Sequence, residues 1–130
     1  MQKRLPPRKV LYGGAMLDQK EIDAVVQVMQ KGMAVGKQVQ TFEKRCAEVM
    51  GHKYGVMVNS GSSALMLAMR MLNLPKGSEV ITPVLTFSTD VASIVHAGYV
   101  PVFVDVELDT YQIDIGRIER VIGPNTRAML

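Results

Sequence analysis

From residue 54 onward, short apolar runs alternate with stretches in which apolar residues recur every three or four positions. The runs cover residues 56–58, 79–82, 101–106 and 126–130. They are apolar at successive positions, as strands buried on both faces require, and the stretches between them have helical spacing. A strand–helix–strand series closes by right-handed crossovers, so the sequence predicts an α/β fold with a mostly parallel sheet and helices on both faces.

Two helices are expected before this series. The first has Asp18 as its N-cap and Glu21 three residues later, the spacing of a capping box. Its apolar stripe consists of Ile22, Val25, Val26 and Met29, and the second helix carries Val39, Phe42, Cys46 and Val49 on one face. This pattern predicts that Cys46 is a packed thiol rather than a nucleophile.

The predicted organisation is one incomplete domain over residues 1–130. Residues 1–53 form an N-terminal segment with two helices, and residues 54–130 form the βα units. Because the last run of apolar residues stops inside an expected strand, we interpret the chain as the front part of a longer protein.

Composition and charge argue against several classes of function. The net charge is +3 and the basic residues are scattered, so nucleic acid is not an expected partner. No apolar run reaches the roughly 18 residues of a membrane span. His52 and His96 have no second ligand at metal-binding spacing, so no metal site is expected. The single cysteine fits a reducing cytoplasm.

Four small polar residues, Ser60 to Ser63 with Gly61 among them, follow the run at 56–58. In an open parallel sheet, ligands bind beyond the carboxyl ends of the strands. A helix that begins near Ser62 offers free N–H groups and a partial positive charge to an anion such as phosphate. An N-cap and turn without a ligand is the alternative. The loop matches neither of the glycine-rich nucleotide-binding motifs.

A second loop, residues 83–90, leaves the same edge of the predicted sheet. Phe87 within it could form a flat aromatic wall beside the serines, and packing in the core is the alternative for this residue. Asp90 lies a turn further on and could approach the site. Asp105 ends the third run, where we expect it to cap the turn through Asp109 and Thr110 rather than to orient a ligand.

Four stretches together resemble the DegT/DnrJ/EryC1/StrS sugar aminotransferases. They are GKQVQTFEKRCAEVMGHKYGVMV, VNSGSSALMLAM, GSEVITPVLTFSTDVASIVHAG and PVFVDVELDTYQIDIGRIERVI. The resemblance runs from about residue 12 onward, in the same order and spacing. It implies the N-terminal part of the large domain of a fold-type-I enzyme that uses pyridoxal 5′-phosphate (PLP).

The resemblance also implies roles for individual residues. Ser62 and Ser63, with Gly61, would bind the cofactor phosphate, and Phe87 would stack on the pyridine ring. The lysine that holds PLP covalently and the Asp that pairs with the pyridine nitrogen lie beyond residue 130 in such enzymes. No catalytic residue is therefore assigned within this chain, and we expect the chain by itself to be inactive.

The activity implied is transfer of an amino group, usually from glutamate, to the keto sugar of a sugar nucleotide, in polysaccharide or lipopolysaccharide biosynthesis. Such enzymes are cytoplasmic homodimers. Two alternatives stay open: a PLP-dependent sugar-nucleotide dehydratase of the same fold, in which a histidine replaces the lysine, and a non-catalytic phosphate-binding fragment. Residues 1–130 do not distinguish the reactions or identify the sugar.

Overall fold

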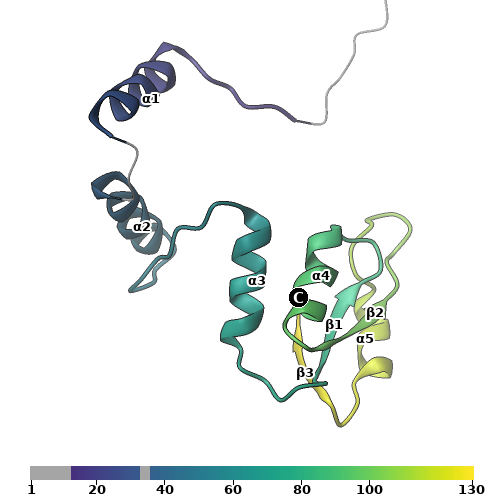
Figure 1. The fold of residues 1–130 in the computed structure, drawn as a ribbon. Coiled ribbons are helices and arrows are strands. Elements are labelled where there is room, and N and C mark those ends of the chain that lie inside the picture. Colours follow the sequence, from purple (N-terminus) through teal and green to yellow (C-terminus); the bar gives the residue numbers. More distant parts are fainter. Residues whose placement is uncertain (1–12, 33–35) are drawn as a thin grey trace, which may run out of the picture. The chain divides into compact units, whose positions relative to one another are not determined.

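The computed structural model describes residues 13–32 and 36–130. The chain divides into two compact units, residues 1–55 and residues 56–130. Figure 1 labels the helices and strands of both units.

The first unit contains helices α1 (Gln19–Lys31) and α2 (Lys37–Val49). The predicted capping box is confirmed: the Lys20 amide donates to Asp18 Oδ1 at 2.8 Å, and the Asp18 amide donates to Glu21 Oε2 at 2.8 Å. These bonds satisfy amides that the helix itself cannot pair. The cap therefore fixes where α1 begins.

The apolar faces of these two helices are less buried than the sequence predicts. Helix α1 has no buried residue, and its four stripe residues, Ile22, Val25, Val26 and Met29, are all exposed. In α2 only Ala47 is buried, and Cys46 is half-buried. The two predicted helices are confirmed. Helical spacing identifies an apolar face, but it does not show whether another surface covers that face.

The second unit holds three strands and three helices. In chain order they are α3 (Gly61–Met71), β1 (Glu79–Pro83), α4 (Ser88–His96), β2 (Val100–Val104), α5 (Ile115–Val121) and β3 (Thr126–Met129). The strands form one parallel sheet in the order β2-β1-β3. The predicted parallel α/β arrangement is confirmed.

The chain moves from β1 to β2 in one direction across the sheet and from β2 back past β1 to β3 in the other. Because both crossovers are expected to be right-handed, this reversal predicts that α4 and α5 cover opposite faces. The central strand is correspondingly buried on both sides, with Val80, Ile81 and Thr82 all inaccessible to solvent or nearly so.

The predicted strand at 56–58 is wrong. Residues 56–58 form no strand in the structure, and Val56 and Met57 are exposed. A strand needs a neighbouring strand for its backbone groups, and the three strands of this sheet pair only with one another. Similarly, β2 ends at Val104, and Val106 instead forms an isolated antiparallel bridge with Ile113.

The core of the second unit joins α3 and α4 to the sheet. Met69 of α3, Val80 of β1, Ile94 of α4 and Tyr99 form one buried cluster. Tyr99 also accepts a hydrogen bond from the Leu74 amide at 3.0 Å, which ties the connection between α3 and β1 to the start of β2. This cluster holds α3 and α4 side by side.

Candidate functional site

Helices α3 and α4 begin at the same end of the second unit. In Figure 1 both start at the end toward which β1 and β2 point, which is the carboxyl edge of the sheet. The two helices pack against each other. The polar loop before α3 and the loop between β1 and α4 are therefore brought to one edge, as the sequence predicts.

The first turn of α3 is organised by Ser60. Ser60 is the N-cap, and its hydroxyl oxygen accepts from the Ser63 amide at 3.1 Å. The Ser60 hydroxyl donates to Ser63 Oγ at 3.1 Å, and the Ser63 hydroxyl donates to Asn59 Oδ1 at 2.6 Å. The sequence predicts a helix that begins near Ser62 but does not identify Ser60 as its N-cap, although serine is among the preferred N-cap residues.

Gly61 and Ser62 take part in none of these three side-chain bonds. Their amides lie in the first turn, where an α-helix supplies no carbonyl acceptor. A Cβ added at Gly61 would meet no other atom within 4 Å. The turn therefore presents amide donors and open space together, which suits the approach of an anion.

Phe87 is the N-cap of α4, and its side chain is 71% exposed. The alternative that Phe87 packs in the core is therefore wrong for this unit. An exposed aromatic ring beside a helix N-terminus offers a flat apolar surface on which a planar ligand can stack.

Two hydrogen bonds flank Phe87. The Thr86 hydroxyl donates to Asp90 Oδ2, and the Asp90 amide donates to the Phe87 carbonyl oxygen at 2.9 Å. Thr86 and Asp90 are both half-buried. The sequence predicts Asp90 near the site but not its bond to Thr86, because a four-residue spacing alone does not specify a side-chain hydrogen bond.

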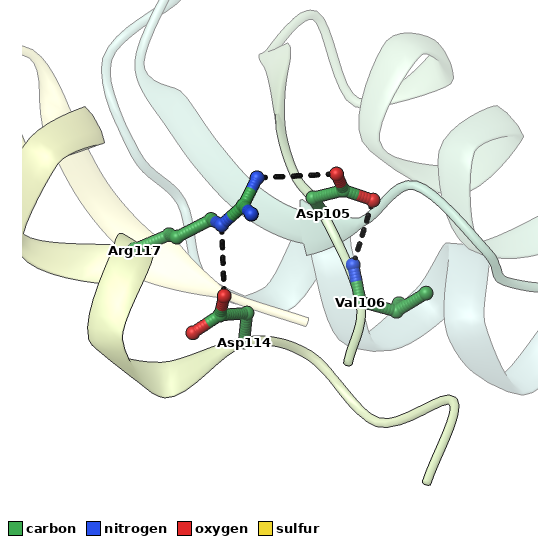
Figure 2. A network of polar contacts seen from close by, with 4 residues as sticks. All are labelled: Asp105, Val106, Asp114 and Arg117. Carbon is green, nitrogen blue, oxygen red and sulfur yellow. Dashed lines mark hydrogen bonds and ion pairs between the residues drawn. The ribbon is translucent and has the colours of Figure 1, made fainter. Parts of the chain in front are cut away.

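Asp105 has a structural role that differs from the predicted one. Figure 2 shows Arg117 of α5 between two carboxylates: its guanidinium lies 3.2 Å from Asp105 Oδ2 and 2.8 Å from Asp114 Oδ2. The other oxygen of Asp105 accepts from the Val106 amide at 2.9 Å. One carboxylate oxygen of Asp105 thus joins the end of β2 to α5 through Arg117, and the other binds the adjacent backbone.

The turn through Asp109 and Thr110 is held by Glu107 rather than by Asp105. The Thr110 hydroxyl donates to Glu107 Oε2 at 3.0 Å, and the Tyr111 amide donates to the Glu107 carbonyl oxygen at 2.8 Å. The expectation that Asp105 caps this turn is wrong, because Arg117 and the Val106 amide bind its carboxylate instead.

Two other features of the described part of the chain concern metal ions and membranes. Residues 13–32 and 36–130 contain no group of three or more His, Cys, Asp or Glu side chains that could hold a metal ion. Within the same residues, every helix is too short or too polar to cross a membrane. Lys76 lies in the turn before β1, at the amino edge of the sheet and away from the two helix N-termini.

The fold and this edge define a class: a parallel α/β unit with a serine-rich helix N-terminus beside an exposed aromatic residue. Residues 15–130 match the model of the DegT/DnrJ/EryC1/StrS aminotransferase family. The chain belongs to this family.

The relatives are named as proteins of polysaccharide or sugar-nucleotide metabolism. The spore coat polysaccharide biosynthesis protein SpsC of Bacillus subtilis is 38% identical over 120 residues, which are 92% of this chain and 31% of that protein. The dTDP-4-dehydro-2,6-dideoxy-D-glucose 3-dehydratase of Saccharopolyspora spinosa is 39% identical over 126 residues, 90% of this chain and 27% of that enzyme. The chain thus spans about a third of the length of these relatives.

Solved structures agree with this assignment. GDP-4-keto-6-deoxy-D-mannose-3-dehydratase of E. coli, with bound hydrated PLP, has a TM-score of 0.82 and 32% identity, and the match covers 89% of this chain and 32% of that one. The PLP form of Spr1654 of Streptococcus pneumoniae has a TM-score of 0.84 and 28% identity, and the match covers 94% of this chain and 31% of that one. The second unit therefore has the fold of part of a PLP-dependent enzyme.

Proposed function

We propose that this chain is the N-terminal part of a PLP-dependent aminotransferase that acts on the keto sugar of a sugar nucleotide, with an amino acid, glutamate by preference, as the amino donor. The observation that carries the proposal is the pairing of two features at one sheet edge. The first turn of α3 offers donors for an anion, and Phe87 at the start of the neighbouring α4 offers an aromatic face.

The residues present fit both the phosphate group and the aromatic ring of PLP. Gly61 and Ser62 would hold the phosphate through their first-turn amides, the Ser62 hydroxyl and the positive end of α3. Ser63, proposed from the family resemblance as a third phosphate ligand, would act by holding this turn in place, since its amide donates to Ser60 and its hydroxyl to Asn59. The open space beyond Gly61 lets an anion approach the backbone closely. Phe87 would hold the ring by stacking, since its own ring is largely free of protein contacts.

When bound, PLP supplies the electron sink for chemistry at the carbon that carries the amino group. The residues of this chain have binding and orienting roles. The first turn of α3 fixes one end of the cofactor, and Phe87 fixes the plane of its ring. No residue of this chain is proposed to move a proton.

A dehydratase of the same fold is the second candidate. It is favoured by the 39% identity to the dTDP-sugar 3-dehydratase and by the structural match to the GDP-sugar 3-dehydratase. The binding roles proposed for α3 and Phe87 are the same in both candidates. The third candidate is a non-catalytic fragment that binds phosphate. Such a fragment would bind phosphate with no preference for a ligand that carries an aromatic ring.

Two further expectations accompany the proposal. The full-length protein is proposed to be a homodimer, as the family resemblance implies. A cytoplasmic location stays a prediction from the single cysteine.

The test is a titration with PLP, followed by its visible absorbance, of the wild-type protein and of paired variants at the two positions. Phe87→Leu removes the aromatic face and Phe87→Tyr keeps it, while Ser62→Ala removes the hydroxyl and Ser62→Thr keeps it. We expect saturable binding by the wild type and the two conservative variants. Phe87→Leu should bind about tenfold more weakly, the scale of a lost aromatic stacking interaction.

Equal affinity in Phe87→Leu and the wild type would contradict stacking on Phe87. Binding of inorganic phosphate as tight as that of PLP would favour the non-catalytic fragment. Absence of saturable PLP binding by the folded wild-type protein would refute the proposed function for this chain.

A further inference from the structure

The orientation of Phe87 depends on the backbone that carries it. Phe87 is 71% exposed, so core packing within this unit does not fix the direction of its ring. Phenylalanine also has no side-chain acceptor for the amides of the helix it begins, and α4 accordingly has no side-chain cap from Phe87. Something other than Phe87 itself must therefore hold the start of α4.

Asp90 and Thr86 provide that restraint. The Thr86 hydroxyl donates to Asp90 Oδ2, which closes a side-chain bridge over Phe87. Beneath the bridge, the Asp90 amide donates to the Phe87 carbonyl oxygen at 2.9 Å. The bridge joins residues on both sides of Phe87, so it restricts the backbone that carries the ring.

Both ends of this loop are attached to rigid elements. The Val84 amide donates to the Val104 carbonyl oxygen of β2 at 2.8 Å. Ser93, which is fully buried in α4, donates its hydroxyl to the Asp90 carbonyl oxygen at 2.8 Å. The bridge thus closes a short segment whose ends are fixed to β2 and to the buried face of α4.

We propose that Asp90 is a positioning residue of the cofactor site, and that it acts through Phe87. Its carboxylate accepts the Thr86 hydroxyl and so holds the Phe87 ring in the direction in which it stacks on the cofactor ring. The inference rests on the proposed function. What the site requires from Asp90 is an acceptor at this position, not its negative charge.

Three single variants separate the acceptor from the charge. Asp90→Ala removes the acceptor, and Thr86→Val removes the donor while the carboxylate remains. Asp90→Asn keeps a carbonyl oxygen that can accept from Thr86. We expect Asp90→Ala and Thr86→Val each to weaken PLP binding by up to about tenfold, the effect of one lost hydrogen bond. Asp90→Asn should bind close to the wild type.

The decisive readout is a double-mutant cycle with Phe87→Ala, because a residue that acts through Phe87 has no effect once that ring is gone. In the Phe87→Ala background, Asp90→Ala should cause no further loss of PLP affinity. In the single variants, the induced circular dichroism of bound PLP should fall, since it reports how the cofactor ring is held.

Two results would overturn the inference: an unchanged PLP affinity in Thr86→Val, or an equal loss from Asp90→Ala with and without Phe87. Thr86→Val keeps the test decisive if Asp90→Ala does not fold. A wild-type protein that does not bind PLP would refute the proposed function, and the inference with it. A wild type that binds PLP beside an unaffected Thr86→Val would refute the inference alone.

Discussion

At position 61, helix stability and anion binding favour different residues. Alanine would stabilise the helix, whereas glycine leaves space for an anion. Gly61 lies in the first turn of α3 without a left-handed backbone, and a Cβ there would meet no other atom within 4 Å. Glycine is therefore not required by the fold at this position. Its absence of a side chain leaves the neighbouring amides accessible, which is the property that phosphate binding uses.

Gly61→Ala should raise the free energy of unfolding by up to about 1 kcal/mol, because alanine loses less backbone entropy in a helix. The same variant should weaken PLP binding, since the new methyl group occupies the space through which the phosphate approaches. Urea denaturation and a PLP titration measure the two effects separately.

Ser60→Ala is the matched control, since it removes the N-cap and leaves Gly61 unchanged. It should lower the free energy of unfolding by about 1 kcal/mol. A loss of stability in Gly61→Ala would show that the fold needs glycine there, and would contradict the role given to it.

At this scale the sequence predicted the location of the donors but not their hydrogen bonding. Ser62 and Ser63 follow from the preference of small polar residues for helix starts. That Ser63 is held by Ser60 and Asn59 depends on side-chain rotamers, which residue identity does not specify. For the same reason the turn through Asp109 and Thr110 was wrongly assigned to Asp105. Both Asp105 and Glu107 are acidic residues near this turn, and the position of Arg117 beside Asp105 distinguishes them.

Among the elements, β3 depends on a polar link to β1 outside the main-chain ladder. Thr126 donates its hydroxyl to Glu79 Oε2 at 3.0 Å and accepts from the Gly123 amide at 2.9 Å. Glu79 and Thr126 are paired residues of the two strands. The link lies next to the register shift between Glu79 and Val80, so it helps to fix how β3 aligns.

Thr126→Val keeps the shape of the side chain and removes both bonds. We expect the free energy of unfolding to fall by roughly 1–2 kcal/mol, since two part-buried groups lose their partner. Thr110→Val is the control, because its bond to Glu107 is fully exposed, and it should change stability by less than about 0.5 kcal/mol. Equal effects in the two variants, measured by denaturant unfolding, would show that the Thr126 link contributes nothing specific.

The strands that the sequence predicted correctly are those whose partners lie within the second unit. Strand β1 pairs with β2, the next strand along the chain, and with β3, which follows β2. Apolar runs were sufficient to identify all three strands. Residues 56–58 have the same apolar composition and form no strand. A strand depends on a partner, and apolar composition alone does not say whether one is present.

For the whole molecule, the length of the match is the dominant fact. Each match covers most of this chain but only about a third of the relative or solved structure. The second unit carries the edge to which the cofactor roles are assigned, and the family membership makes the roles of Ser62, Ser63 and Phe87 specific enough to test. Family resemblance supplied those roles, because the fold alone hosts many activities.

The most direct test of the central claim is a crystal structure of the protein grown with PLP. We predict that the phosphate lies at the first turn of α3, within hydrogen-bonding distance of the Gly61 and Ser62 amides, and that the ring lies against Phe87. Phosphate bound elsewhere, or a cofactor ring that does not contact Phe87, would contradict the account.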